Sequence, residues 1–262
     1  MATVGRPQLV EQLLQLGVRR GIVLVVHTSF RRVAPVESGP GGLIEALTET
    51  VGPDGTLVMP TMTGSRALVP FDPATTPSRG MGVVAETFRR TSGVLRSSHP
   101  TSSFAARGPL AEAIIAPQPL EPSHSPDSPI GRVADHGGWV LLLGVGHDAN
   151  TTIHLAENLA GVPYRVRKWT TLDVDGEKRR VEYDEIDHCC RNFELVGVWL
   201  EEQGLLRGGR VGHAEARLVR ARDILNVTVP VLHADPLTFL CSPDVRCAEC
   251  DLARASVGPA DG

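Results

Sequence analysis

The chain has 262 residues, of which 42% are hydrophobic and 21% charged, an ordinary composition for a globular protein of one large domain or two small ones. Its net charge of −4 argues against a dedicated nucleic-acid-binding protein, and no apolar stretch approaches the length of a bilayer span. The N-terminus lacks the pattern of a signal peptide and the five cysteines are an odd number, so we expect reduced thiols in a cytoplasmic protein.

The first predicted strand ends in a group of hydrogen-bond donors. A helix is expected over residues 7–17, and the continuous apolar run of residues 22–26 is typical of a strand buried on both faces. The polar residues after this run are suited to binding an anion, although a capped loop with solvated arginines is an equally good interpretation. These residues are His27, Thr28, Ser29, Arg31 and Arg32.

A second strand and a long irregular loop follow. A helix over residues 43–51 and a strand over residues 56–59 predict parallel pairing with the first strand through a right-handed crossover. Residues 60–82 are rich in Pro, Gly, Thr and Ser, and an irregular stretch of this length inside a domain is more often a functional loop than a spacer. After a helix at 81–90, another loop offers donors to an anion or to its own turn. These are Arg96, Ser97, Ser98 and His99.

Residues 139–158 carry the clearest chemistry. A short apolar strand ends at Gly144 and Gly146, and a helix is expected to begin near Thr152. His154 and Glu157 then lie three residues apart on one face of that helix. Because α/β folds place their ligands just beyond the carboxyl ends of strands, this histidine with its carboxylate neighbour is a catalytic candidate.

The second half of the chain predicts additional β structure. Residues 168–183 are typical of a β-hairpin, and residues 211–219 of another strand. We therefore expect a single α/β domain over residues 1–262. Its central, mostly parallel sheet is flanked by helices and accompanied by an antiparallel β patch within a β-rich subregion at about residues 165–220.

Common catalytic and metal-binding motifs are absent from the sequence. There is no Gly-x-Ser-x-Gly elbow, no P-loop and no His-Glu-x-x-His helix, and the glycine turn lacks the third glycine of a dinucleotide fingerprint. Cys247 and Cys250 form one Cys-x-x-Cys pair, with Cys241 and His233 nearby. Structural zinc normally needs four ligands from two such pairs, so we expect no metal, and the Cys189–Cys190 pair receives no role.

Several stretches resemble, in order, the aminoglycoside 3-N-acetyltransferase family, whose members are antibiotic acetyltransferases. The resemblance extends from residue 25 to residue 214 and includes residues 25–29, 52–60, 95–105, 128–131, 141–146, 150–157 and 212–214. It implies an antibiotic N-acetyltransferase fold and acetyl-CoA as the acetyl donor. It further implies that the acceptor is the 3-amino group of a 2-deoxystreptamine aminoglycoside, so that the activity confers antibiotic resistance.

The resemblance also implies catalytic roles. His154 stands at the family's histidine and would be the general base, for which an imidazole is suited near neutral pH. Glu157 or another acid would orient the imidazole or hold ammonium groups of the substrate. Thr151 or Thr152 would donate a hydrogen bond to the thioester oxygen as negative charge develops. The amine attacks the thioester directly, so no covalent acyl-enzyme is required.

For coenzyme A, the resemblance points to the two donor-rich turns at residues 27–32 and 96–99. For the aminoglycoside, the acidic residues of the loops and helices form the natural anionic surface. These are Asp72, Glu86, Glu157, Asp184 and Asp187.

Three alternatives remain open at this point. The chain could acetylate another amine in a biosynthetic pathway, or it could bind a small molecule without catalysis. A metal-dependent function would depend on Cys241, Cys247 and Cys250. We expect the protein to be a monomer or a homodimer.

Overall fold

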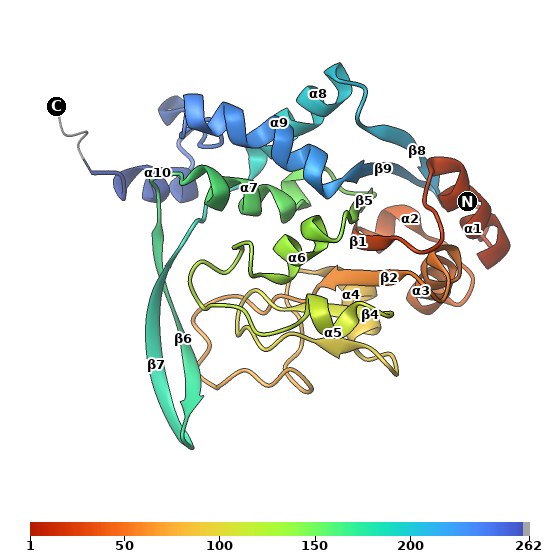
Figure 1. The fold of residues 1–262 in the computed structure, drawn as a ribbon, viewed down its shortest axis with the longest axis horizontal. Coiled ribbons are helices and arrows are strands. Elements are labelled where there is room, and N and C mark those ends of the chain that lie inside the picture. Colours follow the sequence, from red (N-terminus) through yellow and green to blue (C-terminus); the bar gives the residue numbers. More distant parts are fainter. Residues whose placement is uncertain (259–262) are drawn as a thin grey trace.

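A seven-stranded sheet in the order β3-β4-β2-β1-β5-β9-β8 forms the centre of the computed structural model, which describes residues 1–258 (Figure 1). Its middle is parallel, since β1 (Val23–Thr28) pairs in parallel with both β2 (Thr56–Pro60) and β5 (Trp139–Leu143). Both edges are antiparallel. They consist of β3 (Leu95–Arg96) and β4 (Phe104–Arg107) on one side and β9 (Ala214–Arg220) and β8 (Arg207–Val211) on the other.

Helices cover both faces of this sheet and create two hydrophobic cores. Along β1, Leu24 and Val26 face one core while Val23 and Val25 face the other, as the alternation of a strand requires. The first core is covered by α1 (Arg6–Leu16), α2 (Phe30–Val33), α3 (Gly39–Val51) and α4 (Gly82–Arg89). The second is covered by α5 (Ala111–Ile114), α6 (Pro129–Asp135), α7 (Thr152–Ala160), α8 (Glu194–Glu202), α9 (Ala221–Ala234) and α10 (Ala248–Ala255).

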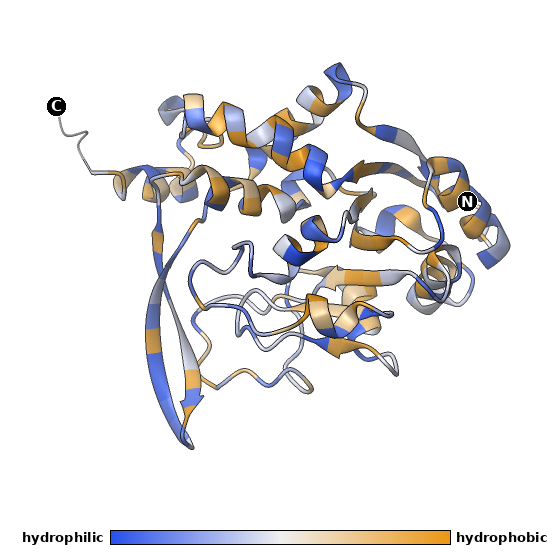
Figure 2. Ribbon diagram, viewed as in Figure 1, coloured by the Kyte–Doolittle hydropathy of each residue, from blue (hydrophilic) through white to orange (hydrophobic). Residues whose placement is uncertain are grey.

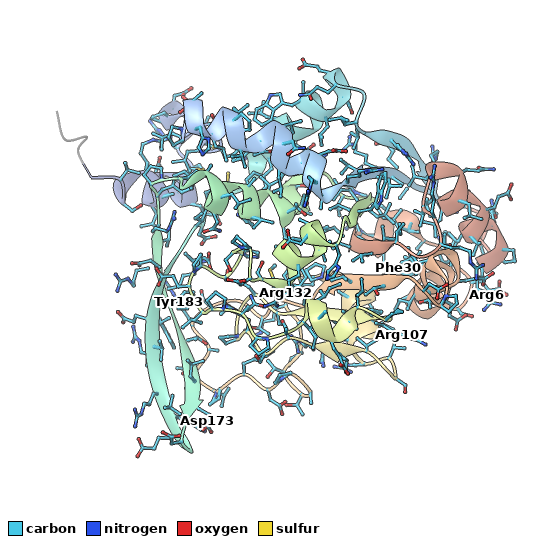
Figure 3. The ribbon with its side chains drawn as sticks, in the orientation of Figure 1. Arg6, Phe30, Arg107, Arg132, Asp173 and Tyr183 are labelled. Atoms are coloured by element: carbon cyan, nitrogen blue, oxygen red, sulfur yellow. The ribbon has the colours of Figure 1, made fainter. Side chains whose placement is uncertain are left out.

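A separate two-stranded sheet projects from the second helical layer. It consists of β6 (Val166–Val174) and β7 (Glu177–Glu185) and carries mainly hydrophilic side chains (Figures 1 and 2). Its tip lies near Asp173 and Tyr183 lies closer to its base (Figure 3). The hairpin contacts the irregular loop after β2, because the Arg66 backbone N–H donates to the carbonyl of Trp169 at 2.8 Å.

The predicted α/β architecture with its antiparallel patch is confirmed, but the predicted single strand over residues 211–219 is wrong. Gly212 has a φ of 61° and ends β8, and a side chain there would lie 2.8 Å from Val33. The resulting β8–β9 hairpin belongs to the main sheet, so the separate patch contains only β6 and β7. Within residues 1–258, no helix has both the length and the apolarity to cross a membrane.

Candidate active site

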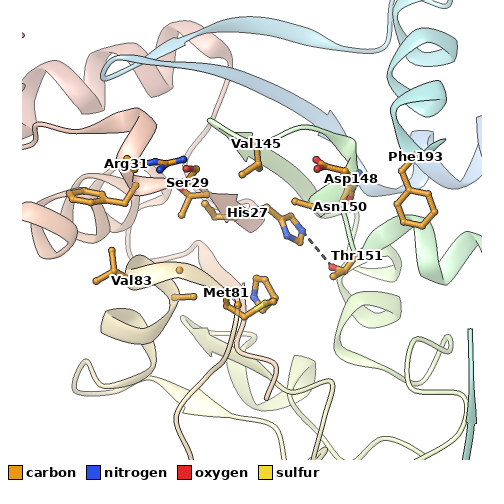
Figure 4. Close-up of a pocket in the computed structure, with 18 of the residues that line it drawn as sticks. His27, Ser29, Arg31, Met81, Val83, Val145, Asp148, Asn150, Thr151 and Phe193 are labelled. Atoms are coloured by element: carbon orange, nitrogen blue, oxygen red, sulfur yellow. Dashed lines mark hydrogen bonds between the residues drawn. The ribbon is translucent and has the colours of Figure 1, made fainter. Parts of the chain in front are cut away.

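A cleft of about 600 Å³ opens at the carboxyl ends of β1 and β5, between the first residues of α4 and α7 (Figure 4). This is the edge at which a parallel sheet with crossover helices binds its ligands. One wall is the end of β1 and the turn after it, residues 26–31, and another is Gly80–Val83 at the start of α4. Thr151, the N-cap residue of α7, and His154, in the first turn of α7, complete the side that is predicted to be catalytic.

His154 and Glu157 form a hydrogen-bonded pair, as their spacing on the helix predicts. His154 Nδ1 donates to Glu157 Oε2 at 2.7 Å. The side chain of Glu157 is fully buried, whereas 17% of the His154 side chain remains exposed on the cleft side. Because Nδ1 is bound to the carboxylate, Nε2 is the imidazole nitrogen left for chemistry.

Glu157 accepts hydrogen bonds from three polar side chains, not from His154 alone. Its second oxygen, Oε1, accepts hydrogen bonds from His188 Nε2 at 2.8 Å and from the Tyr164 hydroxyl. Burial would raise the pKa of Glu157, but hydrogen bonds from His154 and His188 outweigh burial and lower it to about 2. Glu157 is therefore a carboxylate at neutral pH, held in one orientation by three donors.

This carboxylate also changes the basicity of His154. Burial lowers the pKa of His154, but the neighbouring Cys190 and Glu157 favour the imidazolium more strongly, and the pKa rises well above its ordinary value. Cys190 Sγ lies 3.6 Å from His154 Nε2 and also donates to the carbonyl of His188. The ring of Phe193 packs edge-on against His154, with the ring centroids 5.0 Å apart.

Four of the predicted coenzyme A residues line the cleft with the catalytic candidates: His27, Thr28, Ser29 and Arg31. His27 Nε2 lies 3.5 Å from the Thr151 hydroxyl (Figure 4). Burial, and then the charge of His147, lowers the pKa of His27 to about 3, so His27 is a neutral hydrogen-bonding group. Arg32 instead donates to the carbonyl of Gly144 and lines an adjacent hollow of about 560 Å³.

The second predicted coenzyme A turn does not line this cleft. The Arg96 guanidinium donates to Thr61 and to the carbonyls of Pro73 and Thr76, and thereby supports the loop between β2 and α4. Ser97 Oγ accepts the Phe104 N–H, and Ser98 is exposed.

His99 Nδ1 likewise accepts the backbone N–H groups of Thr101 and Ser102. The polar atoms of the turn at residues 96–99 are thus used to hold loops, which favours a supporting role for it.

Two of the predicted aminoglycoside-binding acids have structural partners near the same loop. Asp72 accepts hydrogen bonds from the Ala74 N–H and the Thr75 hydroxyl, which close a local turn. Glu86 forms a bidentate ion pair with Arg89 and accepts a hydrogen bond from the Ser78 N–H, so it links the loop to α4. Neither carboxylate lines the cleft.

The acidic cluster expected after the hairpin lies at its base, with Asp184 and Glu185 inside β7, and contains one inward-facing member. Asp184 pairs with Arg167 at 2.5 Å and Asp187 with Lys168 at 2.9 Å. Because side chains alternate along β7, Glu185 points inward, where the Ser123 hydroxyl is its hydrogen-bonding neighbour and no cation among residues 1–258 forms an ion pair with it. Burial raises its pKa, and it lies close enough to His154 for their charges to interact.

The sequence interpretation missed several groups around His154. His188, Cys190 and Phe193 arrive from the segment after β7, and Tyr164 from the turn after α7, so none is near His154 in the sequence except Tyr164. The adjacent His-Cys-Cys run at residues 188–190 was the available signal, because three polarisable side chains in succession are uncommon on a surface loop.

Two groups of side chains in residues 1–258 have the composition of metal ligands. His154, Glu157 and His188 form one, and four cysteines form the other. In the first group, the carboxylate is already satisfied by hydrogen bonds of 2.7 and 2.8 Å to the two imidazoles, as an orienting acid requires.

The chain matches proteins of one family over most of its length. The family model described as aminoglycoside 3-N-acetyltransferase matches residues 25–233. The chain is 55% identical over 241 residues to aminoglycoside N(3)-acetyltransferase IV of Salmonella sp, with 91% of each chain covered.

Solved structures that match this chain lead to the same family. The H154A variant of aminoglycoside acetyltransferase AAC(3)-IVa, in complex with a gentamicin, matches with a TM-score of 0.94 and 53% identity over 98% of this chain and 99% of that one. AAC-IIIb in a binary complex with CoASH matches with a TM-score of 0.83 and 29% identity over 89% of this chain and 97% of that one. This chain therefore belongs to the aminoglycoside 3-N-acetyltransferase family of enzymes.

Proposed function

We propose that this enzyme transfers the acetyl group of acetyl-CoA to the 3-amino group of 2-deoxystreptamine aminoglycosides, with His154 as the general base. One observation carries this proposal: the imidazole of His154 borders the 600 Å³ cleft while its Nδ1 is fixed by a buried carboxylate. The complexes of relatives with gentamicin and with CoASH support the two substrates.

The reaction forms a C–N bond and breaks the C–S bond of the thioester. His154 Nε2 accepts a proton from the attacking amine, and the imidazolium then gives this proton to the departing coenzyme A thiolate, which leaves as the free thiol. Glu157 keeps the Nδ1–H tautomer and stabilises the imidazolium that forms, which is the role of the orienting acid in a catalytic triad. The Thr151 hydroxyl, on the cleft wall, is the proposed donor to the thioester oxygen.

Coenzyme A is proposed to enter along the end of β1. Thr28 and Ser29 supply hydroxyl groups, Arg31 supplies positive charge, and the first residues of α4 present backbone N–H groups on the opposite wall. No side chain caps the N-terminus of α4, which leaves its first N–H groups free for an anionic group.

The aminoglycoside is proposed to approach from the side of the β6–β7 hairpin. Glu185 offers a buried acid that forms no ion pair among the described residues, and an ammonium group of the substrate would provide one. Asp187, on the segment after β7, is about half exposed and adds a second carboxylate, which pairs with Lys168.

Five free thiols agree with the proposed cytoplasmic location, where thiols stay reduced.

The proposal is tested by supplying acetyl-CoA with kanamycin-, gentamicin- and neomycin-type aminoglycosides and measuring free thiol. Nuclear magnetic resonance of the product locates the acetyl group, which we expect on the 3-amino nitrogen. Thiol release with other amines only would identify a biosynthetic acetyltransferase. Acetyl-CoA binding in calorimetry without any product would identify a non-catalytic binding protein.

A further inference from the structure

Four cysteines from three separate segments meet next to the C-terminal helix. Cys189 follows β7, Cys241 follows α9, Cys247 precedes α10, and Cys250 lies in the first turn of α10. Their four sulfur atoms all lie within 4.8 Å of one another. Cys189 Sγ is 3.4 Å from Cys241 Sγ and 3.5 Å from Cys250 Sγ, although these residues are 52 and 61 positions apart in the chain.

These distances fit ligands around a metal ion and do not fit disulfides. A disulfide requires sulfur atoms about 2.05 Å apart. Four thiolates bound tetrahedrally to zinc at about 2.3 Å have their sulfur atoms about 3.8 Å apart. The geometry points to a structural zinc site formed by Cys189, Cys241, Cys247 and Cys250, outside the cleft.

Backbone N–H groups and an arginine side chain surround the sulfur atoms. The backbone N–H of Arg191 donates to the Cys189 sulfur, and those of Glu249 and Cys250 donate to the Cys247 sulfur. Such hydrogen bonds orient thiolates and offset their negative charge. The Arg254 guanidinium bonds to the carbonyl of Cys241 and brings a positive charge to the cluster.

Simple packing of thiols explains these observations less well. A buried cysteine is common as a small apolar side chain, but a pair in a Cys-x-x-Cys spacing with two further sulfur atoms directed at it is a ligand arrangement. Reduced cysteines in such patterns are more often metal-binding than structural disulfides. Binding of Zn²⁺ converts the four thiols to thiolates and releases their four protons to the solvent, with no change in oxidation state.

A metal at this site would link the C-terminal segment to the segment that positions the catalytic histidine. Cys189 lies directly between His188, which donates to Glu157, and Cys190, which contacts His154. A metal bound to Cys189 therefore fixes both neighbours, and its loss is expected to release them from the catalytic pair.

Elemental analysis of the purified, tag-free enzyme after dialysis against metal-free buffer tests the proposal. We expect about one zinc ion per chain, released as a mercurial reagent titrates four thiols. Cys241→Ser and Cys250→Ser should lose the metal, whereas Cys190→Ser, the matched substitution of the fifth cysteine, should retain it. Cobalt in place of zinc should give the strong visible bands of a tetrahedral thiolate complex.

The titration of the unmodified enzyme keeps the proposal falsifiable even where a cysteine variant fails to fold. Metal-free wild-type enzyme whose five thiols all react without zinc release would overturn the proposal. So would a disulfide among the four cysteines, zinc retained by the Cys241→Ser variant, or iron in place of zinc.

Discussion

Replacing Glu157 with glutamine should inactivate the enzyme while leaving its fold intact. In the wild-type enzyme, the carboxylate accepts from His154 Nδ1, His188 Nε2 and the Tyr164 hydroxyl. Glutamine keeps one oxygen for His188 and Tyr164 but places an NH₂ group against His154 Nδ1. That nitrogen must then accept rather than donate, which moves the imidazole proton to Nε2 and removes the lone pair that receives the proton of the amine.

The expected loss in kcat follows from the contribution that a general base makes to catalysis. General base catalysis accelerates a reaction by about 10²–10⁴-fold, and Glu157→Gln should lower kcat by this factor, or about 3–5 kcal/mol in the activation barrier. The variant should also lose the carboxylate that raises the pKa of His154. Residual activity should therefore reach its plateau at lower pH than in the wild-type enzyme, in which the ascending limb lies above the ordinary histidine pKa of about 6.5.

Thiol release measured from acid to alkaline pH, with thermal unfolding of the same samples, checks both effects. Glu49→Gln is the matched control, because this exposed carboxylate on α3 pairs with Arg6, away from the cleft. We expect it to behave as wild type. An unchanged kcat in Glu157→Gln with an unchanged pH profile would refute the assignment of Glu157 as the orienting acid.

Three further substitutions test other parts of the account. His99 is buried, and its pKa is lowered to about 4. Below pH 6.5 this histidine therefore takes up a proton more readily in the unfolded chain than in the folded one. The free energy of unfolding should fall by up to about 3 kcal/mol by pH 4 as a result. His99→Asn should flatten this part of the pH dependence of the free energy of unfolding, and an equally steep decline would contradict it. Cys190→Ser should retain most of kcat, because the amine attacks directly; loss of turnover together with an acetylated Cys190 in the wild-type enzyme would instead indicate a covalent intermediate. Arg96→Gln should lower the free energy of unfolding by about 2 kcal/mol through its lost hydrogen bonds and leave the Kd for acetyl-CoA unchanged. Unchanged stability with weaker acetyl-CoA binding would place Arg96 in the cofactor site.

The parts of the fold with strong local signals could be predicted from the sequence. The apolar runs of β1, β2 and β5 specify buried strands, and the glycine turn before α7 places His154 at the end of a strand. The spacing of His154 and Glu157 also specifies their hydrogen bond. These features depend on a few neighbouring residues, and the structure confirms them.

The remaining features depend on long-range contacts that no local pattern encodes. The donor-rich turn at Arg96 resembles an anion site, but its donors are used by carbonyls of a loop some twenty to thirty-five residues earlier in the chain. His188 reaches Glu157 from thirty-one residues away, and Cys189 reaches Cys241 and Cys250 from even further. A single Cys-x-x-Cys pair supplies only two of the four sulfur atoms, which is why the sequence predicts no metal site, and only the fold brings Cys189 and Cys241 to the pair.

The central claim, that His154 deprotonates the amine, is tested most directly by His154→Gln. Its kcat for an aminoglycoside should be compared with its Kd for acetyl-CoA and for the aminoglycoside by calorimetry. The account predicts that kcat falls by about 10²–10⁴-fold while both Kd values stay near those of the wild-type enzyme. Wild-type turnover by His154→Gln would contradict it.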